Sequence, residues 1–164
     1  MEERGVCIQA VYLIVLYGFM ILIVIHDIKE RKIYNSILIF MILSYISLCV
    51  IGSIFFNSSI FSKNNIIAAF IICFLFFLMK IMSPSGIGMG DVKLVFVLGL
   101  YLGDTIFEVV MLSLVCMLVY SQIYKKRTRN KKGIPYAPFI FAAMMFYHIF
   151  ISFTYHNGFM ENYK

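Results

Sequence analysis

The fold is decided by residues 36–56, SILIFMILSYISLCVIGSIFF, an apolar run that contains no charged side chain. A helix needs roughly 20 mainly apolar residues to cross the hydrocarbon core of a bilayer, so this run is long enough to span a membrane. Stretches of similar character recur along the chain. They are Ile8–Ile25, Ser36–Phe56, Asn65–Met82, Val92–Leu102, Ile106–Tyr124 and Ile134–Phe153.

The composition of the chain agrees with a membrane protein. Of its 164 residues, 62% are hydrophobic and 13% are charged, whereas a soluble domain has about 45–50% apolar and about 25% charged residues. We therefore predict an all-α, polytopic membrane protein of about six transmembrane helices, with residues 1–164 forming a single membrane-embedded domain. The stretch Val92–Leu102 makes only about 16 Å of helix. We expect it to extend by a turn at either end or to lie at the back of a cavity.

The distribution of basic residues predicts how the chain lies in the membrane. Eleven of the 14 basic residues fall in segments 27–35, 80–93 and 125–132, which share one side if the apolar stretches alternate in direction. We expect that side to be cytoplasmic and the protein to be a multi-pass protein of the plasma membrane. The net charge of +6 follows from this asymmetry and from contact with anionic headgroups, so nucleic-acid binding is not expected.

The N-terminus and the cysteines each have a simple interpretation. The first apolar run lacks a basic segment before it and a small-residue cleavage site after it, so we interpret it as a mature span and not as a signal peptide. No CxxC pair occurs, which argues against a structural zinc site or a disulfide framework. We expect no metal and no cofactor. The cysteines, which we interpret as small packing residues, are Cys7, Cys49, Cys73 and Cys116.

Two aspartates stand at the edges of apolar runs, on the same predicted side of the membrane. Asp27 follows the first run, and Asp91 follows the glycine-rich segment 86–90. An ionisable group at a membrane boundary is costly and usually functional. If the two helices are neighbours, the carboxylates share one proton, so that one can take a proton from water while the other donates to a peptide carbonyl oxygen. This pairing predicts amide hydrolysis without a metal or a covalent intermediate.

The helix ends suggest a role for each carboxylate. Asp91 is expected at the start of a helix, where the macrodipole favours an anion by about 0.3–1 kcal/mol, and Asp27 at a helix C-terminus, where it does not. Our hypothesis is that Asp91 activates water and Asp27 first carries the shared proton. Gly86, Gly88 and Gly90 fit a loop that takes positive φ or lets a second backbone come close, although a plain turn between two spans gives the same pattern.

Two other ionisable residues near the aspartates have open interpretations. His26 can bond to Asp27, or it can be a polar anchor at the interface. Lys93 follows Asp91 by two residues and would point elsewhere on a helix. We interpret it either as a snorkelling lysine or as a contact for a basic substrate leader.

Three blocks of this sequence resemble one family, the type IV prepilin peptidases, which are membrane aspartic proteases with a GxGD signature. Gly88-Met89-Gly90-Asp91 followed by Val92-Lys93-Leu94 is similar to the family's GxGDxKL block. Asp27 with Ile33-Tyr34-Asn35 is similar to its first-aspartate block, and Ile134–Pro138 to the I-P-[FY]-x-P start of its last helix. Presenilin-like proteases share GxGD alone, so the combination of three ordered blocks, from about residue 10 to residue 150, carries the resemblance.

The resemblance implies an endopeptidase that removes the basic leader of a prepilin or pseudopilin on the cytoplasmic side. It implies Asp27 and Asp91 as the catalytic pair and Gly88, Gly90 and Lys93 as substrate-binding residues. The family typically cuts after a glycine, just ahead of the hydrophobic helix of the pilin. The expected partners are that protein substrate and the lipid bilayer.

The chain also departs from the family pattern. Many members carry an added cytoplasmic region with paired cysteines, and the segment 27–35 is too short to hold it. We therefore expect the compact, peptidase-only form, without the methylation activity of larger members. Tyr34 stands where the family has a proline.

Alternatives remain at the level of the sequence. Another protease of the presenilin or signal-peptide-peptidase type would use the same GxGD block. A small membrane transporter or an inactive assembly scaffold would use the aspartate pair as a proton or cation site. Transporters often contain inverted repeats, and no internal repeat is visible in this chain.

Overall fold

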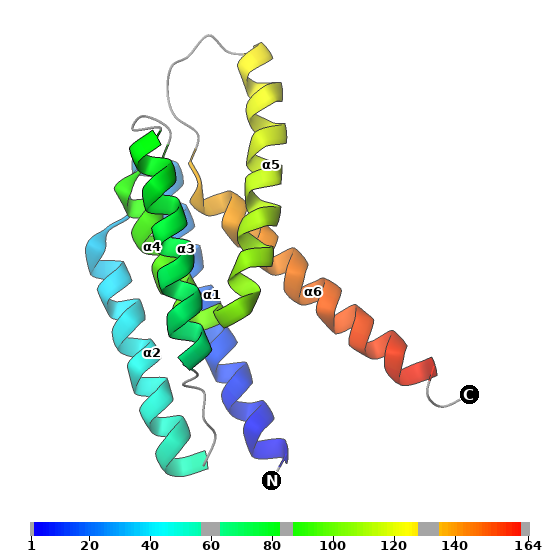
Figure 1. Ribbon diagram of the computed structural model, residues 1–164. Coiled ribbons are helices and arrows are strands. Elements are labelled where there is room, and N and C mark those ends of the chain that lie inside the picture. Colours follow the sequence, from blue (N-terminus) through cyan, green and yellow to red (C-terminus); the bar gives the residue numbers. More distant parts are fainter. Residues whose placement is uncertain (1, 57–62, 83–86, 128–134, 162–164) are drawn as a thin grey trace. The chain divides into compact units, whose positions relative to one another are not determined.

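In the computed structural model of the protein, residues 2–56, 63–82, 87–127 and 135–161 are described, and all regular elements among them are helices (Figure 1). The predicted all-α class is confirmed. The chain divides into two compact units, residues 1–107 and 108–164, and the expectation of a single domain stays a prediction. The elements are α1 (Glu2–Glu30), α2 (Asn35–Phe56), α3 (Lys63–Met82), α4 (Met89–Leu102), the 3-10 helix η1 (Gly103–Thr105), α5 (Ile106–Arg127) and α6 (Ala137–Glu161).

The helices have the length and surface of membrane spans. Among the described residues, four stretches are long and apolar enough to cross a bilayer, and a shorter apolar helical stretch covers 137–151. Large apolar side chains on their outer faces, such as Phe40 and Phe74, are more than half exposed, as expected for contact with lipid. The protein is therefore a membrane protein, while the number of six spans stays a prediction. The four stretches are Ala10–Glu30, Asn35–Ile54, Lys63–Met82 and Met89–Ile123.

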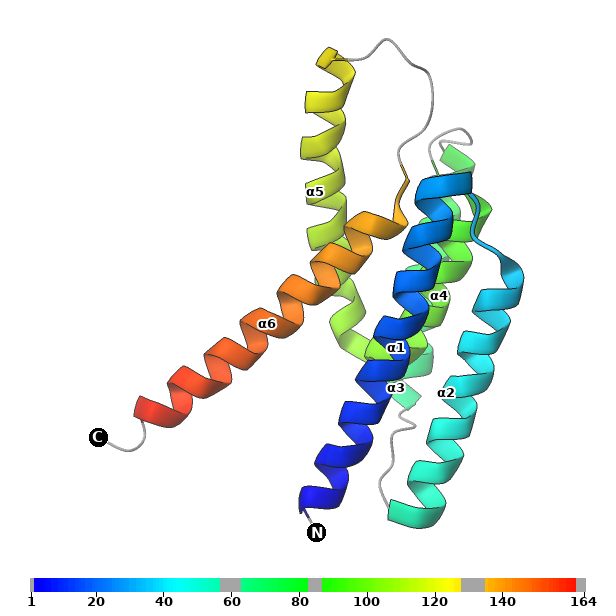
Figure 2. The same cartoon turned by 180° about the vertical axis from the view of Figure 1, so that it is seen from behind.

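The first unit contains α1 to α4, which run side by side (Figures 1 and 2). The short helix α4 packs against both α3 and α2, and α1 packs against α2. Because α4 has neighbours on several sides, many of its side chains are buried. Those with at most 4% of their surface exposed are Val92, Leu94, Val95, Val97, Leu98 and Tyr101.

Two helix ends differ from the apolar runs seen in the sequence. Helix α1 continues past Ile25 to Glu30, because the charged residues that follow are good helix formers. It ends where Arg31 takes a left-handed conformation (φ 54°) and its N–H donates to the carbonyl oxygen of Asp27 (3.0 Å). Asp27 therefore lies inside the last turn of α1. We had expected it to follow the span. Helix α4 begins at Met89, one turn before Val92, as the short run allowed.

Buried hydroxyl groups connect three helices of the first unit. The Tyr12 hydroxyl on α1 donates to the carbonyl oxygen of Tyr101 on α4 (2.6 Å). The Tyr101 hydroxyl donates to the carbonyl oxygen of Met41 on α2 (2.9 Å) and lies 3.0 Å from Ser44 Oγ. Hydrogen bonds between helices hold membrane proteins together where apolar contact alone is no better than contact with lipid. These bonds fix α1, which carries Asp27, relative to α4, which carries Asp91.

The contact between α3 and α4 depends on two small residues. Gly99 lies so close to Ala69 that a Cβ atom at position 99 would be 2.6 Å from the Ala69 Cα and 2.9 Å from its Cβ. Real Cβ atoms do not approach a backbone atom so closely, and small residues allow this kind of close crossing in membranes.

We predict that Gly99→Ala destabilises the protein by about 1–3 kcal/mol, because the added methyl group forces two packed backbones apart. Thermal unfolding in detergent, followed by circular dichroism, measures the loss as a lower Tm. Gly18→Ala on α1 is the matched control, since a Cβ atom there has nothing within 4 Å. Equal Tm values for the two variants would contradict the close crossing.

In the second unit, Tyr136 directly precedes α6 and connects it to α5. Its hydroxyl lies 2.8 Å from Ser113 Oγ, and its carbonyl oxygen accepts the N–H groups of Phe139 (3.0 Å) and Ile140 (3.3 Å). Pro138 falls in the first turn of α6, where its missing N–H costs nothing. The block 134–138 therefore starts a helix, as the resemblance implied, although Ile134 itself lies outside the described residues.

Candidate active site

Asp27 is a buried carboxylate. It lies in the last turn of α1 with only 5% of its surface exposed, although the next turn of the chain is charged and exposed. The positions Leu16, Met20 and Ile23 are also buried and precede it at helical spacing, so Asp27 continues the inward face of α1. Burying a carboxylate is costly without a specific use or partner.

Asp91 lies in the first turn of α4, two residues after the helix begins at Met89. Its Oδ2 atom accepts the N–H of Gly88, the N-cap residue (3.0 Å), and its own N–H donates to the Gly88 carbonyl oxygen (3.1 Å). This is half of a capping box, since glycine has no side chain to complete it. The segment GMGD therefore folds locally into a helix start that holds one carboxylate oxygen in place.

The two predicted aspartates, Asp27 on α1 and Asp91 on α4, lie within electrostatic range of each other. The charge of Asp27 acts on Asp91 even though the residues belong to different helices. Four influences meet at the Asp91 carboxylate. Burial and the Asp27 charge oppose a negative charge there, while the Gly88 N–H and the Lys80 ammonium favour it. Such opposing influences on a pair of carboxylates are typical of acid/base sites.

Lys80 is the site residue that sequence reasoning missed. It lies in the last turn of α3, and its Nζ donates to the carbonyl oxygen of Ile87 (2.6 Å), the residue directly before the Gly88 cap. Its charge also acts on Asp91. In the sequence it counted only as one of the basic residues that set the orientation. A lysine at the end of an apolar run, eight residues before a GxGD block, is the signal that was available.

At Gly90, helix α4 lies close to the segment that connects α1 and α2. A Cβ atom at position 90 would be 3.0 Å from the Ile33 Cβ and 3.5 Å from its Cγ1, so any larger residue would force Ile33 or the first turn of α4 to shift. Gly88 does not use the positive φ that we had considered, since its φ is −74°. Close approach to a second segment is therefore a role that the structure gives to Gly90.

Lys93 points away from Asp91, as its spacing predicted. Its Nζ donates to Asn35 Oδ1 at the start of α2 (3.1 Å). Together with the contact of Gly90 and Ile33, this bond joins the GxGD block to the Ile33-Tyr34-Asn35 block. Whether Gly88, Gly90 and Lys93 touch a substrate stays a prediction.

His26 and Tyr34 form a small group outside the acid pair. His26 Nδ1 donates to the Leu22 carbonyl oxygen (2.8 Å), and its ring meets the Tyr34 ring edge-on at 5.4 Å. The Tyr34 hydroxyl donates to Glu30, and this hydrogen bond raises the pKa of Tyr34 above its ordinary value. Tyr34, which stands where the family has a proline, therefore connects the segment after α1 to that helix through its hydrogen bond to Glu30.

The described residues contain no group of three or more histidine, cysteine, aspartate or glutamate side chains suited to a metal ion. Within the same ranges, Cys49, Cys73 and Cys116 are free thiols; the side chain of Cys7 lies outside them. The groups that the described residues supply at this site are two carboxylates, an ammonium group and backbone amides.

Comparison with known proteins agrees with this geometry. The profile of the type IV leader peptidase family matches residues 14–122, about two thirds of the chain, and this range contains Asp27, Lys80 and the whole GxGD block. Searches of curated proteins and of solved structures gave no significant match. On the strength of the profile match, this chain belongs to the type IV leader peptidase family.

Proposed function

We propose that the protein is a membrane aspartic endopeptidase that removes the basic leader peptide of a type IV prepilin or pseudopilin on the cytoplasmic side of the membrane. Asp27 and Asp91 are the catalytic pair. The observation that carries the proposal is the buried carboxylate of Asp27 acting on the capped carboxylate of Asp91. Membership of the leader peptidase family supports the same substrate class.

In this proposal the two carboxylates share one proton. Asp91 lies at the start of α4 and receives the Gly88 N–H, so it is the member better suited to hold the negative charge and activate water. Asp27 lies at the end of α1, where the helix dipole opposes an anion, and gives its proton to the oxygen of the scissile amide. As the amide breaks, the proton taken from water is available for the leaving amine.

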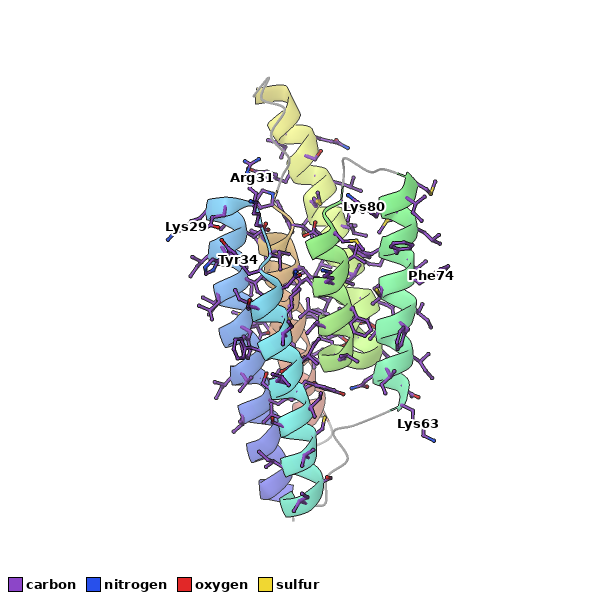
Figure 3. All side chains as sticks on the ribbon, turned by 90° about the vertical axis from the view of Figure 1, so that its left-hand side faces the viewer. Lys29, Arg31, Tyr34, Lys63, Phe74 and Lys80 are labelled. Carbon is purple, nitrogen blue, oxygen red and sulfur yellow. The ribbon has the colours of Figure 1, made fainter. Side chains whose placement is uncertain are left out.

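The cytoplasmic orientation is supported by the charges of the first unit. Lys29, Arg31 and Lys80 lie at the same end of this unit as the acid pair, and Lys63 lies at the opposite end (Figure 3). An excess of lysine and arginine is typical of the cytoplasmic side. A substrate with its basic leader in the cytoplasm and its hydrophobic helix in the membrane would present the junction between them at this level.

The test is direct cleavage. The purified protein in detergent or nanodiscs is mixed with a prepilin that keeps its leader, and the products are measured by mass spectrometry. We expect one cut, after the glycine that precedes the hydrophobic helix. Ion flux through reconstituted protein, without any cut, would favour the transporter instead, and neither activity would favour the scaffold.

Lys80 provides a prediction about charge at this site. We expect Lys80→Met to lower the cleavage rate about fivefold, since it removes a hydrogen bond to Ile87 worth about 1 kcal/mol. We also expect the pH–rate profile to move to higher pH. A cation favours the ionised carboxylates, so without it the singly protonated pair persists to higher pH.

The control for this prediction is Lys63→Met at the other end of α3, which should leave both the rate and the profile unchanged. Lys80→Arg keeps the charge and should keep the pH profile even if the rate falls. A profile that stays in place in Lys80→Met would show that the ammonium does not act on the pair.

A further inference from the structure

A groove of about 540 Å³ lies in the first unit, with walls from α2 and α3 and a floor from α4. Phe70 on α3 and Phe96 on α4 both line it and meet edge-to-face at 5.3 Å. Nearly all of its lining is apolar. The two exceptions, Asn35 and Lys93, lie at the start of α2 and in the first turns of α4, so the polar groups gather at one end.

This groove is distinct from the acid pair. Asp91 and Lys93 are two positions apart on α4, so they are about 200° apart around the helix. Asp91 accepts a hydrogen bond from the Gly88 N–H and lies within range of the Asp27 charge. Lys93 instead donates a hydrogen bond to Asn35. The inference below therefore holds or fails independently of the proposed peptidase activity.

The positive charge at the polar end of the groove favours binding of an anion. Lys93 is exposed and donates to Asn35 Oδ1, a neutral acceptor, and no acidic side chain is among the lining residues. A lysine at a membrane surface attracts anionic headgroups, and its hydrocarbon stem can lie along an apolar wall. The groove thus combines an anion contact with an apolar trough.

The size of the groove favours a hydrocarbon chain over a second helix. The residues of α2 that line it extend from Asn35 to Ile42, about 10 Å along the helix axis. Over that length, a volume of about 540 Å³ leaves a cross-section of roughly 50 Å², whereas an α-helix about 10 Å across with its side chains has a cross-section of roughly 80 Å².

We propose that this groove is a binding site for one anionic phospholipid. The phosphate lies against Lys93 Nζ, and one acyl chain extends along the apolar walls and over the Phe70–Phe96 ring pair. Specific occupation of this kind differs from the general lipid contact of the outer faces, because it requires the lysine and the trough together.

The chain contains no tryptophan, so a single introduced tryptophan reports on the lipid next to it. Phe70→Trp is the reporter in the groove. Phe74→Trp, one turn further along α3 and outside the lining, is its match, since the two phenylalanines are 62% and 61% exposed. Each variant is placed in phosphatidylcholine nanodiscs that contain a small fraction of phosphatidylglycerol with brominated acyl chains, which quench tryptophan.

We expect quenching in Phe70→Trp to correspond to about fivefold enrichment of the brominated anionic lipid, the factor expected for one lysine at the surface. Quenching in Phe74→Trp should follow the bulk fraction. Adding Lys93→Gln to Phe70→Trp should abolish the enrichment. Adding Lys29→Gln instead, a lysine at the same end of the unit (Figure 3) and outside the lining, should retain it.

Three results would overturn the proposal. One is quenching in proportion to the bulk fraction at both reporters. Another is equal enrichment of brominated phosphatidylcholine, which has no net charge. The third is a reporter that responds only when a prepilin is added, which would assign the groove to the apolar helix of the substrate. Circular dichroism of each variant verifies that it is folded, and the comparison of the two lipids needs no variant of Lys93.

Discussion

Asp27→Asn and Asp91→Asn should each lower the rate of prepilin cleavage by about a thousandfold, with folding retained. An amide has nearly the shape of a carboxylic acid, but it can neither take the proton from water nor give one to the scissile amide. Proton transfer by a positioned side chain contributes about 10²–10⁴-fold to a rate, and here both partners are needed. The amount of product over time, measured by mass spectrometry, gives the rates.

Thermal stability separates this loss from unfolding. Two carboxylates near each other repel when both are charged, so replacing one of them with a neutral amide should leave the Tm unchanged or raise it. Asp104→Asn is the matched control, because Asp104 is exposed in η1 and lies outside the site. It should cleave at the wild-type rate.

The double variant tests whether the two residues act as one unit. When catalytic groups depend on each other, removing both costs about as much as removing one. We therefore expect Asp27→Asn with Asp91→Asn to be as slow as either single variant. Substantial cleavage by one single variant would mean that the carboxylates work separately. The same would follow if the rate loss of the double variant equalled the product of the rate losses of the two single variants.

The helices could be predicted from the sequence because length and hydrophobicity alone decide whether a segment spans a membrane. The ends of the helices could not, since charged residues continue a helix as readily as apolar ones. Asp27 illustrates the difference. Its position after an apolar run suggested the membrane edge, but the helix continues to Glu30, so the carboxylate is carried on the buried face of the last turn.

The two candidate aspartates could be named from the sequence, but their surroundings could not be predicted from it. Two aspartates beside flexible backbone stand out in a chain with few charges. Lys80 does not, because a lysine at the end of an apolar helix usually serves as an anchor at the membrane surface. Only the packing of α3 against α4 brings its ammonium to Ile87 and into the range of Asp91.

These contacts give a physical reason for two of the blocks that resemble the family. Gly90 touches Ile33, and Lys93 binds Asn35, so the two motifs that are far apart in the chain meet at two points. Each contact joins the helix that carries Asp91 to the segment that follows Asp27. The spacing inside the GxGD block therefore serves assembly of the pair as well as the local turn.

We predict that Gly90→Val lowers the cleavage rate about a hundredfold. A branched side chain at position 90 collides with the Ile33 Cβ, which is fixed to the backbone and cannot turn away. The first turn of α4 must shift, and Asp91 shifts with it. A displacement of about 1 Å of a catalytic group can cost a factor of about 100 in rate. Rates are measured with the same prepilin assay, together with the Tm.

A second substitution on the other side of the contact identifies the cause. Ile33→Gly removes the Cβ that position 90 meets, so adding it to Gly90→Val should restore the rate about tenfold, whereas Ile33→Val keeps that atom and should restore nothing. Gly18→Val, at a glycine with open space around it, controls for adding the same side chain to a helix of this unit. If Ile33→Gly gives no recovery, the glycine is needed for something other than this approach, and contact with the extended substrate backbone becomes the better explanation.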